Sequence, residues 1–113
     1  MVSLTSEMAA KLEYLSGLDA RADFLVNELR QLDERRRELL AAWELELRLV
    51  DHLANVQPHD ENVYIRFMQG RINCNKRFPQ QLKELDRTSL RLSEKMIDIK
   101  MRIMNCKQYI FGS

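Results

Sequence analysis

A seven-residue apolar repeat runs through the first half of the chain and limits what this chain can fold into. With Met8 at position a of the heptad, apolar residues fill twelve of the fifteen a and d positions. An apolar period of 3.5 residues that keeps its phase over this length predicts one coiled-coil helix, about 75 Å long at 1.5 Å per residue. The a and d positions are Leu4, Met8, Lys11, Leu15, Leu18, Ala22, Leu25, Leu29, Leu32, Arg36, Leu39, Trp43, Glu46, Val50 and Leu53.

The repeat stops near Asn55, and Pro58 suits the first turn of a new helix. A second apolar series, spaced alternately by three and four residues, runs from Tyr64 to Ile110. Pro79 interrupts this series, because a proline inside a helix removes one hydrogen bond and crowds the preceding turn. We therefore expect an all-α chain with arm one at about 4–55, a turn at about 56–60, and arm two in two segments, about 60–77 and 79–110, kinked near Pro79.

The distribution of charge favours an antiparallel helical hairpin. Residues 1–56 carry 7 basic and 11 acidic side chains, a net −4, whereas residues 57–113 carry 11 basic and 6 acidic, a net +5. Folding back places the acidic arm along the basic arm, while parallel pairing with a second copy would place like charges together. The whole chain is therefore expected to form a single helical-hairpin domain.

A turn centred near residue 57 or 58 predicts which residues face each other, because their numbers should sum to about 115. This pairing places Trp43 beside Ile72 and Val50 beside Ile65. One charged residue of the heptad series, Arg36, falls opposite the proline at position 79. We predict that its guanidinium binds the carbonyl group that the proline leaves without a donor.

The apolar surface is wider than a two-helix hairpin can bury, because each helix needs only one stripe for its partner. Contiguous exposed apolar surface usually marks an interface. Since the two arms use up the chain, we expect another chain to cover this surface, in a homodimeric four-helix bundle or a heteromeric helical bundle. The residues predicted to form the oligomer interface are Leu45, Leu49, Ile97, Met101, Met104, Tyr109 and Phe111.

One stretch offers an alternative function. Between Glu61 and Glu84 there is no acidic residue, and five basic residues are interleaved with aromatic ones, a pattern that can bind phosphates and stack on bases. The other interpretation is that these charges complement the acidic first arm and that the aromatic residues are core. The predicted anion or nucleic-acid patch consists of Arg66, Arg71, Lys76, Arg77 and Lys83.

The remaining patterns argue against catalysis, cofactors and metals. His52 and His59 lie near the turn without a third ligand, and Cys74 and Cys106 have no metal-ligand spacing. No apolar run approaches the roughly 20 residues that span a bilayer, and the first residues do not resemble a signal peptide. We expect a non-catalytic, intracellular protein, cytoplasmic or nuclear, that acts as a scaffold or adaptor through protein partners.

Overall fold

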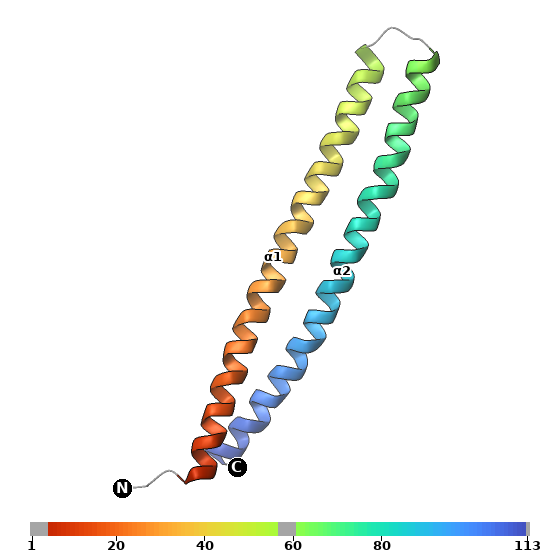
Figure 1. The fold of residues 1–113 in the computed structure, drawn as a ribbon. Coiled ribbons are helices and arrows are strands. Elements are labelled where there is room, and N and C mark those ends of the chain that lie inside the picture. The colour runs from red at the N-terminus through yellow and green to blue at the C-terminus, as the bar shows by residue number, and fades with distance from the viewer. Residues whose placement is uncertain (1–4, 57–60, 113) are drawn as a thin grey trace. The chain divides into compact units, whose positions relative to one another are not determined.

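The computed structural model describes residues 5–56 and 61–112, which form two helices, α1 (Ser6–Val56) and α2 (Glu61–Phe111) (Figure 1). The described ranges contain no strand. The structure thereby confirms the all-α helical hairpin, and α1 agrees with the predicted first arm to within two residues. Most of the predicted turn at 56–60, including Pro58 and His59, lies outside the described residues.

Capping residues are present at the start of α1 and at the end of α2. Thr5 is the N-cap of α1, because its Oγ1 accepts a hydrogen bond from the amide of Met8 at 3.1 Å. Gly112 follows the end of α2 with a φ of 76°, and its amide donates to the carbonyl of Gln108 at 3.0 Å. This left-handed conformation is open to glycine without steric cost, which makes Gly112 the C-terminal cap of α2.

Packing divides the chain into two units, each built from one segment of α1 and one of α2. The terminal unit comprises residues 1–31 and 89–113, and the central unit comprises residues 32–88. In each unit the two helix segments run antiparallel. Glu7 meets Tyr109 and Lys11 meets Cys106 in the terminal unit, and the same reversed order holds for the ion pairs of the central unit.

The terminal unit has an apolar core. Leu18, at 2% exposure, is its most buried side chain. Leu18 and Met96, whose numbers sum to 114 and so fit the predicted pairing, belong to the same cluster. Its buried members come from the a and d positions of α1 and from the matching stripe of α2. The cluster consists of Leu18, Leu25, Met96 and Ile99, with Ala22, Leu92 and Ile103 packed against it.

The central unit is built around an aromatic pair. The Trp43 ring stacks on Phe78 with centroids 6.1 Å apart and planes within 8°, and the Trp43 indole N–H donates to Asn75 Oδ1 at 3.0 Å. Phe78 is buried, together with Cys74 and Leu82 from the same helix. Trp43 is therefore a packing residue that also fixes a polar group on the facing helix.

The predicted pairing of the two arms is wrong in the central unit by about five residues. Trp43 lies against Phe78 instead of Ile72. A Cβ at Gly70 would lie 3.9 Å from Val50 Cγ2, so Val50 lies beside Gly70 instead of Ile65. Both isoleucines are about half exposed. Facing residue numbers therefore sum to about 120.

The shift arises because residues 64–78 carry two apolar stripes. The prediction used Tyr64, Met68 and Ile72, whereas α1 packs against the stripe that contains Cys74 and Phe78. The Trp43–Phe78 stack and the ion pairs to α1 favour the second stripe, because they supply directional contacts as well as buried area. Apolar spacing alone does not distinguish the two stripes.

Two predictions about Pro79 also change. The expected division of arm two is absent, because α2 continues as one helix through Pro79. The proline costs a single helical hydrogen bond, and the buried Phe78 and Leu82 on either side hold the helix in place. The kink itself stays a prediction. The proposed capping by Arg36 is wrong, since Arg36 Nε donates to Asp86 Oδ1 at 3.0 Å, the residue that the shifted pairing brings opposite.

Candidate interaction surfaces

The predicted interface residues on α2 of the terminal unit point away from α1. Ile97, Met101, Met104 and Phe111 are exposed by 52% to 71%. They lie on the opposite side of the helix from the buried stripe that packs on α1, which contains Met96, Ile99 and Cys106. The structure thus leaves these four side chains without cover from the rest of the described chain.

The exposed residues form a heptad series of their own, and the sequence analysis missed its first member. Leu90 is 62% exposed and lies seven residues before Ile97, which in turn is followed at the same spacing by Met104 and Phe111. Residues seven apart lie on one face of a helix, with a drift of about 20° per heptad. We call Leu90, Ile97, Met104 and Phe111, with the adjacent Met101, the outer stripe. The seven-residue spacing was the signal that could have identified Leu90.

One end of the outer stripe borders a hollow with basic side chains. Met104 and Phe111 line it together with Lys100 and Lys107. Neither lysine forms an ion pair or hydrogen bond with another of the described residues. The apolar surface is therefore bordered by two positive charges that the described chain does not neutralise.

Tyr109, also predicted for the interface, is half exposed but already engaged within the terminal unit. Its hydroxyl donates to Glu7 Oε1, and Lys11 Nζ lies 4.9 Å from the centre of its ring. The hydrogen bond to Glu7, with partial burial and the negative charge of Glu7, raises the pKa of Tyr109 above 10.0. Tyr109 thus ties the end of α2 to the start of α1.

The other two predicted interface residues lie on α1 in the central unit. Leu45 and Leu49 are more than half exposed, and Leu53 continues this series at four-residue spacing with 42% exposure. The series is shorter than the outer stripe. It forms a separate apolar surface on a different unit of the protein.

The predicted nucleic-acid patch is partly neutralised by the protein itself. Arg71 pairs with Asp51 at 3.2 Å, and Arg77 pairs with Glu46 at 2.6 Å. Arg66, Lys76 and Lys83 are exposed and form no ion pair within the described residues.

The aromatic residues of that stretch are also largely committed to packing. Phe78 is buried against Trp43, and Phe67 is half-buried. Only Tyr64, at 56% exposure, presents most of a ring to solvent. Stacking on bases requires free ring faces, so the arrangement favours the interpretation in which the basic stretch complements α1.

A buried thiol and an ion pair form a polar cluster in the central unit. Cys74 Sγ donates to Glu46 Oε2 at 2.9 Å, and Arg77 Nη2 donates to the same carboxylate at 2.6 Å. The hydrogen bond to Glu46 and burial raise the pKa of Cys74 above 9.0. A thiol held in its protonated form is a poor nucleophile, so this cluster is a packing feature.

The second cysteine also behaves as a core residue. Cys106 is buried, and its Sγ lies 3.4 Å from the carbonyl oxygen of Lys11 as a weak hydrogen-bond donor. Among the residues that the structure describes, both thiols are free, and no group of three potential metal ligands occurs. His52 is exposed.

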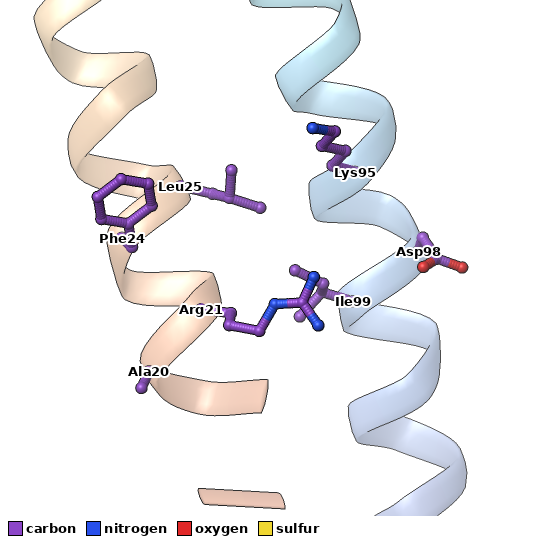
Figure 2. A pocket seen from close by; sticks show the side chains of 7 residues that line it. All are labelled: Ala20, Arg21, Phe24, Leu25, Lys95, Asp98 and Ile99. Carbon is purple, nitrogen blue, oxygen red and sulfur yellow. The ribbon is translucent and has the colours of Figure 1, made fainter. Parts of the chain in front are cut away.

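A shallow groove crosses the terminal unit between α1 and α2 (Figure 2). Arg21 extends from α1 toward Ile99 of α2, and Lys95 stands on α2 near the facing Leu25. The buried Leu25 and Ile99 form the floor, and the exposed Phe24 ring forms one edge. The groove is lined by two basic side chains, Arg21 and Lys95, and by the acidic Asp98.

Comparisons with protein-family models, curated proteins and solved structures find no match to this chain. No helix in the described ranges has the length and apolar content needed to cross a membrane.

Proposed function

We propose that this protein is a non-catalytic helical interaction module, in which helices of another chain cover the apolar surfaces that the hairpin leaves exposed. Such a protein acts as a scaffold or adaptor subunit of a multi-protein complex. The observation that carries the proposal is the outer stripe of α2, in which four members repeat every seven residues and all five are more than half exposed.

The regularity of the stripe supports an interface over incidental exposure. Single exposed apolar residues are common on soluble proteins and need no explanation. A heptad series on the side of a helix that faces away from its partner is the pattern of a second coiled-coil contact. A helix with apolar residues around most of its circumference is typically buried on more than one side. Homodimeric and heteromeric bundles both satisfy this requirement.

The proposal is tested by a pair of single substitutions at neighbouring positions. Met104→Glu places a charge within the outer stripe, and Asn105→Glu places the same charge on an exposed position off the stripe. Sedimentation velocity at micromolar concentrations measures self-association, and labelled helical peptides measure binding to other chains. We expect Met104→Glu to abolish the association and Asn105→Glu to preserve it.

A wild-type protein that remains monomeric, unfolds cooperatively and binds no helical peptide would contradict the proposal. Equal effects of the two substitutions would also contradict it, because association would then depend on overall charge instead of on the stripe. Circular dichroism of both variants establishes that α2 remains helical.

A further inference from the structure

The charges beside the outer stripe indicate which kind of helix it binds, an inference that rests on the proposed function. The stripe and the residues between its members alternate four- and three-residue spacings, as the a and d positions of a coiled coil do. On one flank of this series, the residues that directly precede Met101 and Gln108 are lysines. The series is Leu90, Glu94, Ile97, Met101, Met104, Gln108 and Phe111, and the flanking residues are Ser93, Lys100 and Lys107.

Lys100 and Lys107 are placed to meet a partner helix at two consecutive heptads. They are seven residues apart on one side of α2, roughly 10 Å along the axis at 1.5 Å per residue. Both line the hollow beside Met104 and Phe111, and neither has an ionic partner in the described chain. Flanking charges of this type set partner choice and orientation in coiled coils.

Pairing of the stripe with a second copy is unfavourable for these lysines. An antiparallel pair that faces Ile97 with Met104 has its two-fold axis between residues 100 and 101, which brings the two Lys100 side chains together. The same pairing places Glu94 opposite Lys107, and this attraction offsets only part of the repulsion between the two Lys100 side chains. A parallel pair places each lysine beside its own copy. Like charges in these positions oppose association.

We propose that the outer stripe binds an acidic amphipathic helix of a different protein. The apolar a and d side chains of that helix cover Ile97, Met104 and Phe111. Carboxylates at equivalent positions of two consecutive heptads pair with Lys100 and Lys107. The partner is thus defined by a heptad repeat with acidic flanks.

The experiment uses the full chain and two synthetic peptides of four heptads with leucine at the a and d positions. One peptide has glutamate at all e and g positions, and the other has lysine there. Fluorescence anisotropy at low salt measures both affinities. We expect the acidic peptide to bind about three- to thirty-fold more tightly, the effect of two exposed charge pairs. Salt should reduce this preference because it screens exposed charges.

Two double variants test whether the preference arises at the stripe. Lys100→Glu with Lys107→Glu should reverse the preference toward the basic peptide. Arg30→Glu with Arg35→Glu makes the same change of charge at two exposed residues of α1, off the outer stripe and its flanks, and should retain the preference for the acidic peptide.

The remaining outcomes separate this inference from the proposed function. No preference between the peptides, or equal changes in both double variants, would overturn the acidic partner. If the chain alone forms a dimer that Met104→Glu dissociates, a second copy covers the stripe, so the inference fails and the proposed function stands. If the chain neither self-associates nor binds either peptide, both fail.

Discussion

The two packing units use different interactions to hold α1 against α2. The terminal unit depends on apolar burial, with Leu18, Leu25, Met96 and Ile99 in one cluster. Its polar contacts between the helices involve the ends, where Tyr109 reaches Glu7 and Lys11.

The central unit has a smaller apolar core and more directional contacts. The contacts between its helices include three ion pairs and two hydrogen bonds among the described residues, in addition to the stack of Trp43 on Phe78. The ion pairs are Arg36–Asp86, Glu46–Arg77 and Asp51–Arg71, and the hydrogen bonds are Trp43–Asn75 and Cys74–Glu46.

The two kinds of contact have different roles: apolar burial stabilises the fold, and directional contacts select how the two helices align. Apolar burial supplies most of the free energy of folding but is non-directional, so a shifted pairing of two leucine-rich stripes loses little. Ion pairs and hydrogen bonds contribute less, but a shifted pairing would break each of them. We therefore expect the terminal unit to supply most of the stability and the central unit to fix the alignment of the helices.

The largest predicted effect comes from the apolar core of the terminal unit. Leu18→Ala removes the most buried side chain and leaves a cavity, which should lower the free energy of unfolding by about 2–5 kcal/mol. Urea unfolding followed by circular dichroism measures this loss. Hydrogen exchange should show the greatest loss of protection within residues 5–31 and 89–112.

Leu90→Ala is the matched control, because Leu90 is a leucine of the same unit with 62% exposure. Its effect on the monomer should stay within about 0.5 kcal/mol. Equal losses from Leu18→Ala and Leu90→Ala would mean that burial against α1 is not what stabilises the terminal unit.

A smaller effect is predicted for the aromatic pair of the central unit. Trp43→Phe preserves an aromatic ring against Phe78 but removes the indole N–H that donates to Asn75. The loss should be about 0.5–1.5 kcal/mol, the net value of one hydrogen bond. Asn75→Ala should cause a similar loss, and the double variant should lose less than the sum. Additive losses in urea unfolding would show that the two residues do not interact.

The sequence predicted α1 better than it predicted the alignment of α2. A heptad series that keeps its phase defines the side of α1 that packs, and Thr5 has the chemistry of its N-cap. Between residues 64 and 78 two apolar stripes compete, and the choice depends on the contact of Trp43 with Phe78. That contact joins residues 35 positions apart, so local spacing does not reveal it.

The exposure of the candidate interface residues on α2 was predictable because a hairpin covers only one stripe of each helix. Ile97, Met104 and Phe111 lie off the stripe facing α1, and the structure leaves them exposed. The hydrogen bond of Tyr109 to Glu7 was not predictable, since it depends on how the two helix ends align. Leu90 lies outside the predicted interface, although the seven-residue spacing of Ile97, Met104 and Phe111 extends to it.

The third prediction concerns pH, and it applies to the central unit. The hydrogen bond from Cys74 and the positive charge of Arg77 lower the pKa of Glu46 below 4.5. Glu46 binds a proton more readily in the unfolded chain, so its contribution is complete above pH 4.5 and is lost as pH falls through the lowered pKa. Unfolding followed by the fluorescence of Trp43, the single tryptophan, measures this loss.

Glu46→Gln provides the comparison for that titration. The wild-type protein should lose more stability than the variant between neutral pH and the acid range, because glutamine does not titrate. Parallel pH profiles for the two proteins would contradict a stabilising role of the Glu46 carboxylate. The same variant should increase the rate of Cys74 alkylation at alkaline pH, because Glu46 is the main cause of the raised pKa of that thiol.

The smallest effect is predicted for the exposed pair of Arg36 and Asp86, whose side chains are 45% and 55% exposed. A double-mutant cycle with Arg36→Ala and Asp86→Ala should give a coupling of about 0.2–1 kcal/mol at low salt and close to zero at high salt. Arg37→Ala is the control, since Arg37 pairs with Asp33 on its own helix and should not couple to Asp86. If Arg36 instead stabilised the helix at Pro79, Arg36→Ala would couple to Pro79→Ala and not to Asp86→Ala. The cycle thus distinguishes two roles of Arg36: selecting the alignment of the two helices through Asp86, or satisfying the carbonyl group that Pro79 leaves without a donor within α2.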